Sequence, residues 1–134
     1  AGTMLKTLTH PSTATGLATD AKGRRLAVSH YNGASLWLVA AREDRPTALA
    51  WKGSHIAIAI SPDARYVVTA MQENALHGWR LADGAHMRMS GYPAKTKSLD
   101  FTADGRWLAT SGAESIVCWP FAADGQGARG ARRR

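Results

Sequence analysis

The sequence is poor in the residues that cross-link or anchor a protein. It has a single cysteine, Cys118, so it cannot form an internal disulfide. No apolar run approaches the ~20 residues that a transmembrane helix needs. The first residues lack the basic segment and apolar stretch of a secretory signal peptide. We therefore expect a cytoplasmic protein that folds under reducing conditions. Because Ala and not Met stands at position 1, we also expect a piece of a longer chain.

Motifs for catalysis and metal binding are also missing. No glycine-rich loop followed by Lys-Ser/Thr is present to hold a phosphate. Ser54 and His55 are neighbours on a predicted strand, so their side chains point to opposite faces and cannot act as a nucleophile–base pair. In the segment 86–89, Met87 and Met89 share a face without a third ligand, which makes a poor metal site. We predict no enzyme, no cofactor and no metal.

Positive charge is plentiful, and its position limits what it means. The net charge is +7, but the last six residues hold four arginines, which leaves about +3 for the rest of the chain. This composition predicts a flexible basic tail over residues 122–134. Such a tail is either simply solvated or binds polyanions weakly, with an affinity that falls steeply with salt. The four arginines are Arg129, Arg132, Arg133 and Arg134.

A repeat of about 41 residues runs through the rest of the sequence. The segments 23–29, 64–70 and 105–111 align with one another, and each is followed by a tryptophan. A period of this length is typical of a unit of four strands and is too long for ankyrin or tetratricopeptide repeats. The aligned arginines and tryptophans are Arg24, Arg65 and Arg106, then Trp37, Trp79 and Trp119.

Within each period the pattern is that of β-structure. Isoleucines alternate with small residues from Ile56 to Ile60, which is the periodicity of a strand. The segment 61–65 then breaks the run as a turn, and β-branched residues follow it. We expect strands near 14–19, 25–30, 34–39 and 46–51, then 56–60, 66–70, 75–81 and 86–90, and finally 97–102, 107–112 and 115–120.

These motifs resemble the WD40 repeat family. The segments Ser61–Arg65 and Thr102–Arg106 are similar to the family's Ser-Pro-Asp-Gly-Arg turn, with Asp63 and Asp104 at its aspartate, and the three tryptophans match its Trp-Asp signature. The stretch from Tyr66 onward is similar to divergent bacterial members from alphaproteobacteria. The resemblance implies an all-β chain: a β-propeller segment of about three four-stranded antiparallel blades. The expected blades are 11–51, 54–90 and 95–121.

The chain departs from the family at its hydrogen-bonding positions. The three tryptophans are followed by Leu38, Arg80 and Pro120 instead of aspartate. The aspartate that the family places after its second strand is absent from all three repeats. We therefore expect the family's Asp–His–Ser–Trp network to be broken, so that the rigidity of the repeats comes more from apolar packing.

The phase of the repeat predicts an offset at the N-terminus. Residues 3–9 read as the outer strand of another blade, which is how the resemblance implies that a ring closes. Because three blades cannot close a ring, we expect the missing blades to come from a longer parent chain or from further copies of this one.

The function implied is that of a non-catalytic interaction scaffold that binds a protein or peptide through its loops. Tyrosine and lysine side chains stand out in those loops, and lysines favour an acidic partner. Two alternatives remain open: a polyanion-binding or nucleic-acid-binding accessory protein that uses the arginine tail, and the remnant of a propeller enzyme whose site lies in missing blades. The candidate contact residues are Tyr31, Lys52, Gln72, Tyr92, Lys95 and Lys97.

Overall fold

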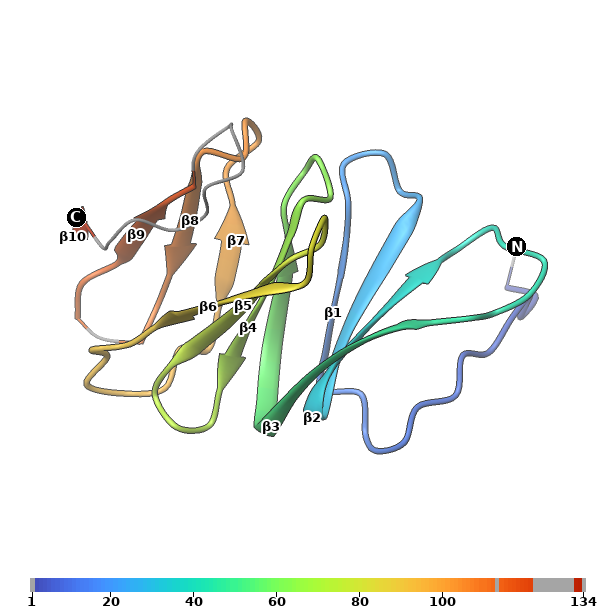
Figure 1. Ribbon diagram of the computed structural model, residues 1–134, viewed down its shortest axis with the longest axis horizontal. Helices are drawn as coiled ribbons and strands as arrows, with labels where there is room; N and C mark the ends of the chain where they lie inside the picture. The colour runs from blue at the N-terminus through green and yellow to red at the C-terminus, as the bar shows by residue number, and fades with distance from the viewer. Residues whose placement is uncertain (1, 113, 122–131, 134) are drawn as a thin grey trace.

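The computed structural model describes residues 2–112, 114–121 and 132–133, and within them all regular structure is β. Six strands form one antiparallel sheet in chain order, and a second sheet has the order β10-β9-β8-β7 (Figure 1). The first sheet contains β1 (Gly16–Thr19), β2 (Arg25–Leu38), β3 (Thr47–Ile60), β4 (Tyr66–Met71), β5 (Leu76–Arg80) and β6 (Ala85–Met89). The second contains β7 (Leu99–Phe101), β8 (Trp107–Thr110), β9 (Val117–Pro120) and β10 (Arg132–Arg133).

The six-stranded sheet bends where β2 and β3 change direction. Both strands have 14 residues, and the register of their pairing shifts between Tyr31 and Gly33. The first part of β3 pairs with β2, and the part from His55 onward pairs with β4. Gly33 and Gly53 have φ values of 148° and 126° at these points, which side chains with a Cβ rarely adopt. The bend turns one half of the sheet to face the other.

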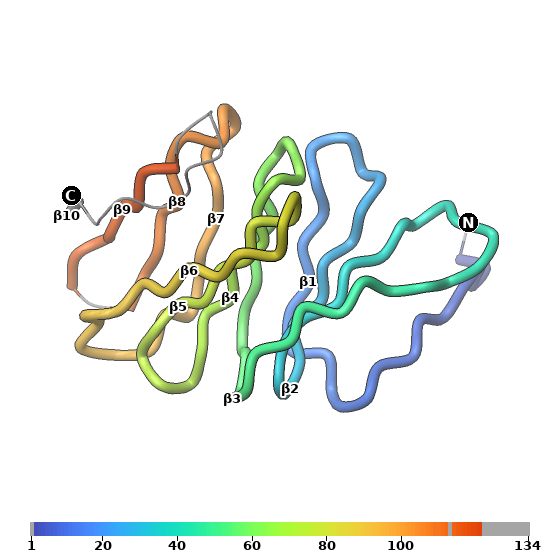
Figure 2. The backbone as a smooth tube through the Cα atoms, viewed as in Figure 1, coloured from blue at the N-terminus to red at the C-terminus, as the bar shows by residue number. Residues whose placement is uncertain are grey.

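The bent sheet and the second sheet make three layers (Figures 1 and 2). Side chains of successive strand residues point to opposite faces. In the middle layer, β4 to β6, both faces of β4 and β5 are buried, whereas β6 exposes His86 and Arg88. One face packs against β2 and the start of β3, around Trp79, and the other packs against the second sheet, around Leu76 and Met89. Such burial on two sides explains why β4 and most of β5 are buried along their whole length.

The three sequence repeats form the same turn. In each, the backbone N–H of the repeated arginine donates to an aspartate carboxylate: Asp20 for Arg24, Asp63 for Arg65 and Asp104 for Arg106. The repeated turn in the first unit uses Asp20 at the position of Ser61, since Lys22 occupies the position of Asp63. The role predicted for Asp63 and Asp104 is thus that of a local cap on the turn.

The repeated tryptophans are buried, and two of their indoles are hydrogen-bonded. Trp37 Nε1 donates to Ser35 Oγ at 2.9 Å, and His10 Nε2 lies 3.2 Å from the same indole nitrogen. Trp119 Nε1 donates to the hydroxyl of Tyr92, which also bonds to Thr110 Oγ1. In the first repeat, the histidine, serine and tryptophan of the expected broken network are thus bonded to one another. In the third repeat, Tyr92 and Thr110 provide the bonding instead.

The predicted propeller segment of about three four-stranded blades is also wrong. The strands expected at 25–30 and 34–39 run on as β2, and those at 46–51 and 56–60 run on as β3, so β1 to β6 are one sheet. The two sheets do not close into a ring. The repeat spacing marked strands and turns well, but it could not show that the backbone stays extended through the expected loops near Tyr31 and Gly53. Residues of those expected loops pair with each other instead, with Tyr31 opposite Ser54.

The predicted N-terminal outer strand is absent too. Residues 2–15 contain no strand, and Lys6 Nζ bonds to the carbonyl oxygens of Val39 and Ala41 and to Asp44 Oδ1 at 2.9 Å. This ion pair and its two backbone contacts hold the segment against its own chain. Of the predicted basic tail, residues 122–131 and 134 lie outside the described residues, and Arg132–Arg133 pairs with β9.

Substituting Tyr92 with phenylalanine tests the network of the third repeat. The change leaves the Trp119 indole and the Thr110 hydroxyl without their shared partner in a buried site. We expect the free energy of unfolding to fall by about 1–3 kcal/mol. Urea unfolding followed by circular dichroism measures it. Tyr31→Phe, at a side chain that is 57% exposed, is the matched control and should change stability by less than about 0.5 kcal/mol. Equal losses in both variants would contradict the assignment.

Candidate functional site

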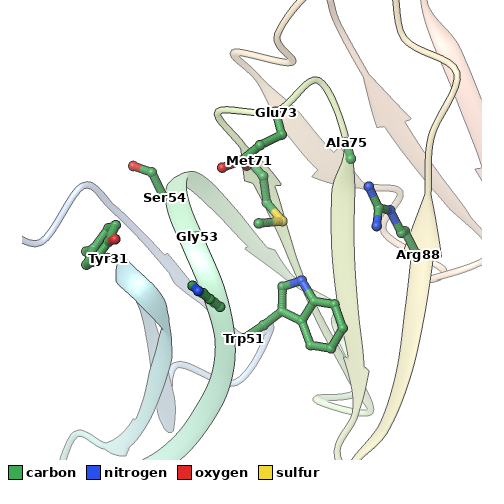
Figure 3. Close-up of a pocket in the computed structure, with 9 residues that line it drawn as sticks. Tyr31, Trp51, Gly53, Ser54, Met71, Glu73, Ala75 and Arg88 are labelled. Atoms are coloured by element: carbon green, nitrogen blue, oxygen red, sulfur yellow. The ribbon is translucent and has the colours of Figure 1, made fainter.

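A pocket of about 550 Å³ opens at the bend of β3 (Figure 3). Its walls come from the bend itself, from the loop between β4 and β5, and from β6. In Figure 3 the Trp51 side chain extends from β3 toward β5 and β6, where Arg88 lies. The Met71 side chain points toward Trp51. The lining residues are Tyr31, Trp51, Lys52, Gly53, Ser54, Met71, Glu73, Ala75 and Arg88. The volume lies within the range of ~300–1,000 Å³ that is common for ligand pockets.

The pocket combines aromatic surface with excess positive charge. Trp51 is 38% exposed, and Tyr31 also faces solvent. Lys52 and Arg88 form no ion pair among the described residues, and Glu73 is the single carboxylate of the lining. The pocket can therefore offer an aromatic platform and two cations to a ligand.

A second pocket of about 470 Å³ between β2, β3 and the turn after β5 differs in this respect. Its two arginines already have carboxylate partners, since Arg25 lies near Asp20 and Arg45 lies 2.6 Å from Glu43. We therefore take the pocket at the bend of β3 as the candidate site.

Histidines pack against the ring of Trp51, which we call the aromatic platform. The Trp51 and His77 rings are stacked, with centroids 4.0 Å apart and planes 15° apart. His77 Nε2 lies 2.7 Å from His86 Nδ1. His55 fixes the backbone beneath the platform: its Nε2 donates to the Trp51 carbonyl oxygen at 2.7 Å, and its Nδ1 accepts from Thr69 Oγ1. His77 and His86 thus contact the indole of Trp51, and His55 holds its backbone. Sequence patterns did not connect these three histidines with Trp51.

Burial lowers the pKa of two of these histidines. It lowers the pKa of His77 to about 4, with further lowering by the nearby His86, His55 and Arg88. Burial also lowers the pKa of His55, against a smaller raising effect of its bond to Trp51 and of Glu73. His77 Nδ1 has no hydrogen-bond partner among the described residues. A proton there would be a buried donor without an acceptor, which agrees with the low pKa of this side chain.

The sequence-predicted contact residues are not all brought together. Tyr31 and Lys52 line the pocket, and the exposed Gln72 lies beside it, where its backbone N–H donates to the Ser54 carbonyl. Lys95 and Lys97 are exposed after β6, outside the lining. Tyr92 is only 8% exposed and belongs to the core, so it is not a surface contact.

Sequence reasoning missed Trp51, Arg88 and the histidines of the site. One feature of the sequence could have indicated Trp51. It does not recur at the repeat period, whereas the buried tryptophans of the repeats do. Arg88 and His86 alternate with Met87 and Met89 on β6, and the two methionines lie on the more buried face of that strand. This alternation was visible in the sequence, but which face would meet Trp51 depends on the bend of β3.

No group of three or more histidine, cysteine, aspartate or glutamate side chains that could hold a metal ion occurs within residues 2–112 and 114–121. Across the part of the chain that the structure describes, no helix is long and apolar enough to cross a membrane. No protein-family model matches the chain, and no curated protein matches it. Membership of the WD40 family and a cytoplasmic location therefore stay predictions.

The low pKa of His77 predicts that the stability of the protein depends on pH. Because the pKa of His77 is about 4 in the folded protein and about 6.5 in an unfolded chain, the unfolded state binds the proton more tightly. The contribution of neutral His77 to the free energy of unfolding is thus fully present above pH 6.5. It is lost as the pH falls toward 4, which lowers the free energy of unfolding by up to about 3 kcal/mol. Urea unfolding at several pH values measures the slope.

The His77→Gln variant is the control for this slope. Its stability at pH 7 can differ from that of the original chain, but its loss between pH 6.5 and 4 should be smaller by most of the His77 share. An unchanged slope in this variant would show that other groups cause the pH dependence.

Proposed function

We propose that this chain is a non-catalytic binding module that holds an acidic segment of a partner protein or peptide in the pocket at the bend of β3. The observation that supports this most directly is the pair Lys52 and Arg88, two cations that form no ion pair among the described residues and that border the exposed ring of Trp51. Trp, Tyr and Arg are the residue types that dominate binding energy at protein interfaces.

The chemistry of the lining favours a peptide ligand of mixed character. A flat indole that is already held by stacking on His77 loses little conformational entropy when an apolar or aromatic side chain settles on it. The two cations attract carboxylates and speed the encounter with an acidic partner. Glu73 opposes a carboxylate placed beside it, so the acidic groups of the ligand belong near Arg88 and Lys52.

Reversing the two charges tests the proposal. The probe is a fluorescein-labelled octapeptide in which glutamate alternates with phenylalanine and valine, and its binding is followed by fluorescence anisotropy. We expect Lys52→Glu and Arg88→Glu each to weaken binding about tenfold, because a favourable charge contact becomes a repulsive one. The affinity of the original chain should also fall as salt is raised.

Lys22→Glu is the matched control, since Lys22 is exposed in the turn before β2, away from the pocket. It alters the net charge by the same amount and should leave binding within about twofold. If Lys22→Glu weakens binding as much as the pocket variants do, only the overall charge matters and the proposed site is wrong. A single-stranded oligonucleotide that binds more tightly than the peptide, independently of Lys52 and Arg88, would favour the polyanion alternative instead.

A further inference from the structure

The strand β6 is an open edge of the first sheet. Within the described part of the chain it pairs with β5 and with no other strand. The other strands that end a sheet, β1, β7 and β10, have four, three and two residues, whereas β6 has five. An edge strand presents a row of backbone N–H and C=O groups that a further strand can pair with. Among the strands that end a sheet in the described residues, β6 thus has the longest such row.

The segment that contains this edge carries positive and no negative side-chain charges. Residues 85–98 include Arg88, Lys95 and Lys97 and contain no aspartate or glutamate. All three cations are exposed. The edge strand β7, in contrast, has Asp100 as its middle residue. Charge complementarity therefore selects an acidic segment for β6 in particular.

The same edge borders the candidate site. His86 and Arg88 are two residues apart on β6, so their side chains share one face of the sheet. The His86 ring lies 5.2 Å from that of Trp51, and Arg88 lines the pocket. A strand added along β6 would project alternate side chains onto this face, beside Arg88 and the opening of the pocket.

We propose that the acidic partner segment binds in an extended conformation, by adding a strand to the β6 edge. Backbone hydrogen bonds to β6 would supply affinity, and side chains on the shared face would contact Arg88 and the Trp51 platform. This inference rests on the proposed function and names the binding mode of the same site.

Charge also argues against a second copy of this chain as the occupant of the edge. Pairing β6 with β6 of another molecule would bring Arg88 and its neighbouring cations close to the same residues of the partner. Like charges opposite one another destabilise strand pairing, and charged residues on an edge are a common device against self-association. An acidic strand removes this repulsion and replaces it with attraction.

N-methylation of the peptide tests the backbone pairing, since a methyl group removes an N–H donor and blocks close approach of the strand. Two versions of the same octapeptide are made, methylated at the odd or at the even positions. In a peptide paired along one edge, only alternate N–H groups face that edge. We expect one version to bind at least tenfold more weakly than the unmethylated peptide and the other to bind within about threefold.

Amide hydrogen exchange on the full chain locates the pairing. Binding of the unmethylated peptide should slow the exchange of amides in β6 at least tenfold and leave those of β7 unchanged. Slower exchange in β7 but not in β6 would overturn the proposal.

The outcomes separate this inference from the function on which it rests. If both methylated peptides bind like the original while Lys52→Glu and Arg88→Glu still weaken binding, strand addition is wrong and the pocket remains a binding site. If the charge reversals have no effect either, the proposed function fails as well. A dimer in analytical ultracentrifugation whose formation slows the exchange of the β6 amides would show that a second copy occupies the edge and would also overturn the inference.

Discussion

The bend of β3 at Gly53 is the constraint on which the remaining structure depends. The backbone there has a φ of 126°, and a Cβ in place of the glycine hydrogen would stand 2.7 Å from the terminal methyl of Met71. The backbone N–H of Gly53 donates to Asn32 Oδ1, which ties this bend to the one in β2. Because the sheet turns here, the half that contains β4 to β6 packs against the half that contains β2. The same turn places Trp51 over His77.

The middle layer then has to bury both of its faces, and this requirement accounts for its polar residues. His55 and Thr69 satisfy each other, and His55 also holds the Trp51 carbonyl, so these groups can be buried at little cost. Trp79 Nε1 and His77 Nδ1, however, have no partner among the described residues. Unsatisfied buried groups destabilise a protein by about 1–3 kcal/mol each. The middle repeat is therefore less completely bonded than its neighbours, and it forms one wall of the candidate site.

The sequence predicted strands and turns better than it predicted their assembly. The turns before Arg24, Arg65 and Arg106 were evident because their aspartate, glycine and serine residues act locally. The expected strand 66–70 nearly coincides with β4 because its β-branched residues suit a sheet. The continuity of β2 and β3 depends on hydrogen bonds between distant segments, for which a single sequence gives no signal. Tyr92 illustrates the same limit, because a tyrosine in a polar loop gives no sign that its hydroxyl will bond to Trp119.

The repeats differ at one position in a way that explains where the candidate site lies. Two residues before each repeated tryptophan stand Ser35, His77 and Val117. The serine bonds to its tryptophan, and the valine leaves that task to Tyr92. The histidine instead turns its Nε2 to His86 and offers its ring to Trp51. A residue that closes the core in one repeat thus becomes the support of an exposed aromatic side chain in another.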